Sequence, residues 1–162
     1  MTSKSDFSEE EWTRIVRSPF VAGMAISMAD PGGPIEIAKE SVGMLRAATS
    51  PTSREQLVTE AALDIQAESQ QRQNPLKGYK PSKDAAGTLA DQVLAELTDV
   101  RALIAEKATP AETAAFGQWL VDVAQAAADA AKEGGFMGFG AEQVSAGEKA
   151  MIERVQAAVR GG

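Results

Sequence analysis

The chain of 162 residues contains no cysteine and no histidine. The absence of cysteine excludes disulfides, thiolate nucleophiles, and zinc or iron–sulfur sites built from cysteine. The absence of histidine removes the commonest metal ligand and the usual base near neutral pH. A ferritin-like di-iron bundle and a haem with a proximal histidine are excluded for the same reason. Because the familiar nucleophile–base triads cannot be built, we expect a protein that is not an enzyme and has no cofactor.

Aromatic residues and long apolar runs are also scarce. Only 5% of the residues are aromatic, and the longest apolar stretch, residues 19–29, is too short to span a bilayer. The first eleven residues are polar and acidic, which is unlike a signal peptide. These features predict a cytoplasmic protein with no transmembrane segment.

Acidic residues outnumber basic ones, and the net charge is −7. An acidic surface repels the phosphate backbone of nucleic acids. We therefore expect no nucleic-acid partner.

Alanine is abundant, with 30 residues, and it is the strongest helix former. Hydrophobic residues make up 44% of the chain, which is enough for one folded domain. This composition predicts an all-α fold in which helices pack closely through small side chains. We expect a compact single domain over residues 1–162, with residues 1–6 and 161–162 frayed.

Helix starts are marked by the capping-box spacing, in which a Ser or Thr precedes a Glu by three residues. Phe7 and Trp12 flank the first of these starts as a hydrophobic staple. With the apolar periodicity, the marks predict about seven helices, the first two separated at Ser18-Pro19. The capping-box pairs are Ser8–Glu11, Thr52–Glu55, Thr109–Glu112 and Ser145–Glu148, and the expected helices begin near residues 8, 20, 34, 52, 89, 110 and 145.

Two of these helices have regular apolar stripes at steps of three and four residues, which predicts a buried face on each. The stripes are Leu89, Val93, Leu97, Val100 and Ile104 on one helix, and Phe116, Leu120, Val123, Ala127 and Ala131 on the next.

The most distinctive segment is the glycine-rich loop over residues 134–140. Its glycines allow close backbone approaches, while its aromatic and methionine side chains are costly to expose. The loop is either a surface that binds a partner or ligand, or a cover folded over one end of the bundle. The candidate binding residues are Gly135, Phe136, Met137, Gly138, Phe139 and Gly140.

Two weaker patterns concern ions. Asp30 and Glu142, each in an oxygen-rich turn, are candidate ligands for Ca²⁺ or Mg²⁺, although neither turn has the spacing of an EF-hand.

The cluster around residues 77–83 is the one basic region of the chain. It indicates either a site for an anionic ligand or acidic partner, or a solubilising loop; its members are Arg72, Lys77, Tyr79, Lys80 and Lys83.

Two segments share one plan: an alanine-rich helix, a break, an Ile or Val, and a helix with an early Glu. The first runs from Ala25 through Asp30 to Ile35 and Glu40, and the second from Ala126 to Val144-Ser145 and Glu148. This plan resembles the duplicated modules of the tellurium-resistance TerB-like family. The resemblance implies an all-α fold of two related modules and a stress-linked role, which is either the binding of a divalent cation by carboxylates or association with a membrane complex.

The glycine loop followed by Val144-Ser145 and Glu148 also resembles small bacterial all-α proteins with a Gly-Gly-Phe-x-Gly-x-Gly loop before a final Val-Ser-x-x-Glu helix. That resemblance implies a fold and no activity. We therefore expect a non-enzymatic helical protein that acts by protein–protein interaction, or by self-association through an alanine-rich face. The alternative is a TerB-like stress-response module that binds a divalent cation.

Overall fold

A computed structural model of the chain describes residues 2–29, 34–77, 79, 88–132 and 146–160. The described residues form six α-helices and one short 3-10 helix, with no strand among them, so the all-α prediction is confirmed. The elements are η1 (Lys4–Asp6), α1 (Glu9–Ala29), α2 (Pro34–Thr49), α3 (Gln56–Gln70), α4 (Leu89–Ala105), α5 (Pro110–Lys132) and α6 (Ala146–Arg160).

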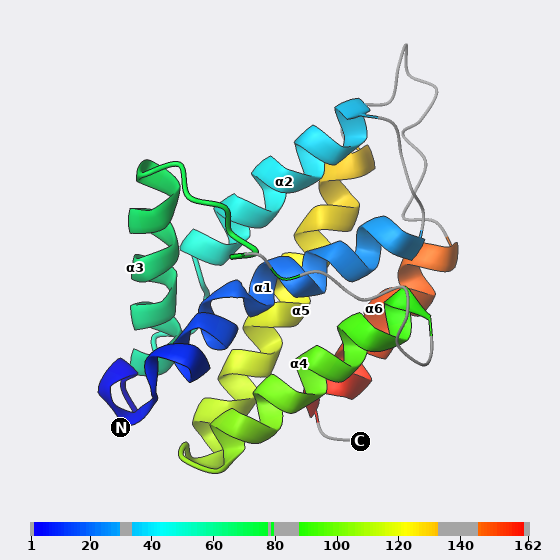
Figure 1. Cartoon of the computed structure of the whole chain (residues 1–162). Helices are drawn as coiled ribbons and strands as arrows, with labels where there is room; N and C mark the ends of the chain where they lie inside the picture. The colour runs from blue at the N-terminus through cyan, green and yellow to red at the C-terminus, as the bar shows by residue number, and fades with distance from the viewer. Residues whose placement is uncertain (1, 30–33, 78, 80–87, 133–145, 161–162) are drawn as a thin grey trace.

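Helices α1 and α5 form the centre of the bundle, and each of them contacts all the other α-helices. Figure 1 shows α3 beside the N-terminal end of α1 at one side of the bundle, with α4 and α6 at the other. Among the described residues, no helix combines the length and the apolar character that crossing a membrane requires.

The prediction of seven helices is wrong because α1 continues through Ser18-Pro19. A proline inside a helix has no N–H for the carbonyl four residues earlier, which here belongs to Ile15. The Ser18 hydroxyl donates a hydrogen bond of 2.6 Å to that carbonyl oxygen. Since the orphaned acceptor is satisfied locally, the two expected helices are one.

Two of the predicted capping boxes are confirmed. The amide of Glu11 donates to Ser8 Oγ and the amide of Ser8 to Glu11 Oε1, and the rings of Phe7 and Trp12 lie 6.0 Å apart as the staple requires. The box at Thr109 and Glu112 closes in the same way at the start of α5.

The box expected at Thr52 and Glu55 is wrong. Helix α3 begins four residues after Thr52, and Ser53 Oγ accepts the amide of Glu55 instead. A box that we did not predict caps α4, where Thr88 and Asp91 exchange hydrogen bonds. The aspartate of this box differs from the Glu or Gln of the usual capping-box pattern, so that pattern does not predict it. Ser145, the first residue of the last predicted box, lies outside the described residues.

Both apolar stripes face the core. Val93, Leu97, Val100 and Ile104 on α4 are fully buried and Leu89 is half-buried; on α5, Phe116, Leu120, Val123 and Ala127 are fully buried. The side chain of Ala131 lies outside the described part.

The alanine-rich faces of α1 and α5 also lie inside the bundle. Ala25 on α1 and Ala124, Ala127 and Ala128 on α5 are fully buried. These alanines pack helices of one chain together, so they are not available as a self-association face.

The first residues of the chain, for which we expected fraying, contact the rest of the bundle. Thr2 is buried and hydrogen-bonds to Glu112 at the start of α5, while the amide of Lys4 donates to Glu60 on α3. Met1 lies outside the described residues.

Candidate functional site

A pocket of about 420 Å³ opens between α1, α2, α3 and the segment that follows α3. This volume is in the range of small-molecule sites, which are typically lined by apolar side chains with a few polar groups. Its apolar lining is Phe20, Met24, Met44, Leu45, Ile65, Pro75 and Leu76, and its polar lining is Ser27, Ser41, Glu68, Ser69, Arg72 and Gln73.

The wall between α1 and α2 depends on a glycine. A β-carbon built at Gly23 would lie only 1.8 Å from Sδ of Met44, so any other residue at this position would require the Met44 side chain to move from its present place against α1. Met24 and Met44 are both only partly buried. Because methionine side chains are flexible and polarisable, these two residues give the pocket a wall that can adapt to an apolar occupant.

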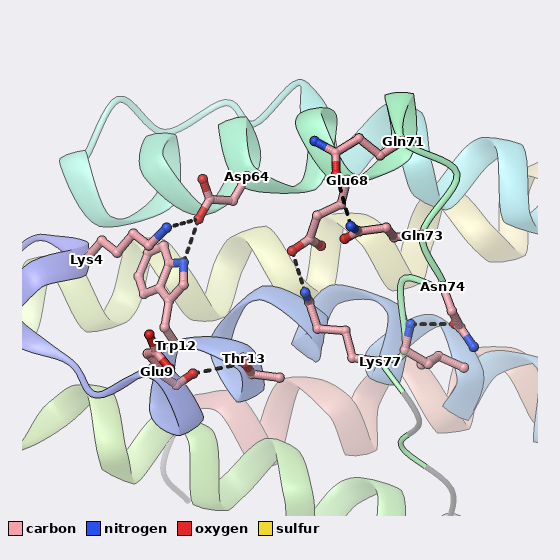
Figure 2. A network of polar contacts seen from close by, with 11 residues as sticks. Lys4, Glu9, Trp12, Thr13, Asp64, Glu68, Gln71, Gln73, Asn74 and Lys77 are labelled. Carbon is pink, nitrogen blue, oxygen red and sulfur yellow. Dashed lines mark hydrogen bonds and ion pairs between the residues drawn. The ribbon is translucent and has the colours of Figure 1, made fainter.

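Helix α3, the opposite wall, is held in place by contacts with the N-terminal segment. Trp12 Nε1 donates a 2.7 Å hydrogen bond to Asp64 Oδ2, and Lys4 Nζ lies 2.8 Å from the same oxygen (Figure 2). Burial raises the pKa of the Asp64 carboxyl, but the hydrogen bonds from Lys4 and Trp12 outweigh it and hold the pKa below its ordinary value. The carboxylate is therefore ionised and fixed in position near neutral pH.

The segment after α3 is drawn back over the pocket by a second ion pair. Lys77 Nζ pairs with Glu68 on α3, as Figure 2 shows. Between them, the amides of Leu76 and Lys77 donate to the side chain and the carbonyl of Asn74, forming a tight turn. This turn places Pro75 and Leu76 at the pocket as its outer wall.

Arg72 occupies an unusual backbone position at the rim. Helix α3 ends in a Schellman motif, in which the amides of Arg72 and Gln73 donate to the carbonyls of Ser69 and Glu68. The motif requires a left-handed residue, and Arg72 adopts it with φ of 59°. Glycine is the residue that takes this conformation without steric cost, so an arginine here is strained.

The strain leads to a testable expectation for stability. Replacing Arg72 with glycine relieves the steric cost of the left-handed conformation, which outweighs the added flexibility of the unfolded chain. We expect Arg72→Gly to raise the free energy of unfolding, measured with urea, by about 0.5 to 1 kcal/mol. Gln71→Gly is the matched control. Because Gln71 has a φ of −87°, glycine relieves no strain at this position and should lower the free energy of unfolding. An unchanged or lower stability of Arg72→Gly would contradict the assignment of strain.

The site residues predicted from the sequence do not coincide with this pocket. Gly135, Phe136, Met137, Gly138, Phe139 and Gly140 lie outside the described residues, as do the candidate metal ligands Asp30 and Glu142. In the part of the chain that the structure describes, no group of three or more acidic residues could hold a metal ion.

The predicted basic cluster separates into different contacts. Lys77 pairs with Glu68, Tyr79 lies with its ring centre 5.1 Å from the guanidinium carbon of Arg17, and Arg72 lines the pocket. Lys80 and Lys83 lie outside the described residues. The described members therefore do not form one open basic surface.

The pocket itself was missed by the sequence analysis. The residues that could have indicated it are Gly23, inside the apolar stretch of α1, and the methionines Met24 and Met44, which have the pattern of ordinary core residues.

Comparisons with protein-family models, curated proteins and solved structures found no match to this chain.

Proposed function

We propose that this chain is a non-enzymatic binding protein and that the pocket between α1, α2 and α3 holds the apolar part of its ligand. The observation that supports the proposal is the pocket itself. Small-molecule sites are concave and lined mostly by apolar side chains with a few polar groups. The described lining of this pocket has that character, with apolar side chains such as Phe20, Met24 and Leu45 beside a few polar ones.

The polar groups at the pocket favour binding over catalysis. The one carboxylate among its described lining residues, on Glu68, is engaged by Lys77. The chain has no imidazole or thiol that could activate the hydroxyls of the serine residues in the lining. These groups can orient a ligand by hydrogen bonds and charge.

Self-association receives less support from the described surface. Its exposed large hydrophobic residues are Val42 on α2 and Leu63 on α3, exposed by 60% and 58%. Single exposed apolar side chains are normal on monomeric proteins and do not form an interface. A partner protein that inserts apolar side chains would use the same pocket as a small ligand.

Titration with octan-1-ol tests the proposal, with the methyl groups of ¹³C-labelled methionines observed by NMR. We expect saturable shifts at Met24 and Met44. Ser69→Phe places an aromatic ring in the pocket, which should weaken octan-1-ol binding at least about tenfold, since one lost buried side-chain contact costs about 1.4 kcal/mol or more.

Gln66→Phe is the control, because Gln66 lies on the same helix, is exposed and does not line the pocket. It should bind octan-1-ol like the unmodified chain. Shifts that never saturate, or that Ser69→Phe leaves unchanged, would show that the pocket is not a binding site.

A further inference from the structure

We propose that the ligand of this pocket carries a carboxylate, which Arg72 binds, at the end of an aliphatic body that the apolar walls hold. The inference rests on the proposed function, because it names the chemistry of the ligand for the same pocket. It follows from the charges at the rim and from the conformation of Arg72.

Among the described residues that line the pocket, two have charged side chains, Glu68 and Arg72. The Glu68 carboxylate is neutralised by Lys77, and both side chains of this pair are mostly buried. Within the described residues, the exposed side chain of Arg72 has no ion pair and no hydrogen bond from its guanidinium. As far as the described residues go, the rim therefore presents one unpaired positive charge, in a protein whose net charge is −7.

The backbone conformation of Arg72 is the second observation. A cation near the C-terminal end of a helix interacts favourably with the helix dipole, but any position in the last turn would serve that purpose. The dipole therefore does not explain why the strained left-handed position is not occupied by glycine. Strain that persists in a structure is often associated with a functional position, and here it places a guanidinium at the mouth of an apolar pocket.

Two carbonyls in the last turn of α3, those of Glu68 and Ser69, already accept the amides of Gln73 and Arg72, which lessens their repulsion of an anion at this position. A guanidinium matches a carboxylate with two parallel hydrogen bonds, while the walls formed by Met24, Met44 and Leu45 suit an alkyl chain. One arginine balances a single negative charge, which fits a carboxylate better than a doubly charged phosphate monoester.

Three ligands with the same alkyl chain test the charge preference: octanoate, octan-1-ol and octylammonium. We expect octanoate to bind about ten times more tightly than octan-1-ol at pH 7 and low salt, and octylammonium to bind more weakly than both. Arg72→Gln should reduce octanoate binding to the level of octan-1-ol. Arg72→Lys should recover part of the preference, because it keeps the charge but not the paired donors.

Arg46→Gln is the control, because Arg46 is an exposed arginine of α2 that does not line the pocket. It should leave the octanoate preference intact. If none of the three ligands binds, the proposed function fails. If octan-1-ol binds as tightly as octanoate, or if Arg72→Gln keeps the preference, the pocket is a binding site but the carboxylate inference is wrong.

Discussion

Replacing Gly43 with valine should lower the free energy of unfolding by about 3 kcal/mol, the upper part of the range for overpacked cores. Gly43 lies on α2 against α5, one of the two helices that contact all the other α-helices. A β-carbon at this position would lie 2.8 Å from Cβ of Ala130 and 3.0 Å from the carbonyl oxygen of Ala126. Valine adds two further methyl groups to a space that is already too small for one.

The cost is large because the obstacle is a helix backbone. A flexible side chain could rotate away, but the carbonyl of Ala126 moves only if α5 moves. Gly43 therefore sets the distance between α2 and α5, and separating the two helices would weaken contacts over much of the bundle.

Urea unfolding of the two proteins measures this effect. The neighbouring Val42→Ala is the control, because Val42 is 60% exposed and its loss should change stability by less than about 0.5 kcal/mol. A stability of Gly43→Val within 0.5 kcal/mol of the unmodified chain would mean that α2 and α5 are not packed as closely as the structure shows.

The sequence predicted those parts of the fold that depend on local chemistry. The boxes at Ser8 and Thr109 require only a hydroxyl and a carboxylate three residues apart, so the spacing predicts them correctly. The stripe of α4 follows from helix geometry alone, and Val93 and Leu97 are buried as expected.

Other features depended on competition between neighbouring residues. Pro19 would normally end a helix, and the rule fails because the Ser18 hydroxyl bonds the carbonyl that Pro19 leaves free. The start expected at Thr52 fails because Ser53 bonds the amide of Glu55 first. The residues involved in both cases can be seen in the sequence. Which hydrogen bond forms depends on the local backbone geometry, which the periodicity of apolar residues does not describe.

The pocket could not be predicted because it exists only in three dimensions. Gly23 and Met44 belong to different helices, and nothing in the spacing between them indicates contact. In the sequence, Arg72 is an ordinary polar residue near the end of a helix. Its left-handed conformation can be recognised only from the hydrogen bonds of the Schellman motif. The sequence pointed instead to the glycine loop at residues 134–140, which lies outside the described residues.

Glu112 should make the stability of the fold depend on pH in the acidic range. Its carboxylate accepts the amide of Thr2 at 2.8 Å, the amide of Thr109 at 2.8 Å and the hydroxyl of Thr2 at 2.7 Å. The amide bonds from Thr2 and Thr109, together with the Thr2 hydroxyl, hold the pKa of Glu112 at about 2, below the ordinary value of 4.5. The ionised form is therefore stabilised by folding.

The direction of the pH effect follows from that lowered pKa. A carboxyl group with a lower pKa in the folded state contributes its full stability above the pKa of the unfolded chain. The contribution of Glu112 is then lost as the pH falls from about 4.5 towards 2, because the folded carboxylate becomes protonated over this range. Near neutral pH we expect Glu112→Gln to lower the free energy of unfolding by about 2 kcal/mol, since the amide of glutamine cannot accept all three hydrogen bonds.

Urea unfolding of both proteins between pH 7 and pH 2.5 measures the difference at each pH. We expect it to be constant above about pH 5.5 and to shrink steadily below the ordinary carboxyl pKa. Glu11→Gln is the control, because Glu11 belongs to the same type of capping box but its hydrogen bonds are exposed to solvent. Glu11→Gln should lower the free energy of unfolding by less than Glu112→Gln does. A difference for Glu112→Gln that stays the same across the whole pH range would show that its carboxylate does not hold Thr2 and Thr109 together as the structure indicates.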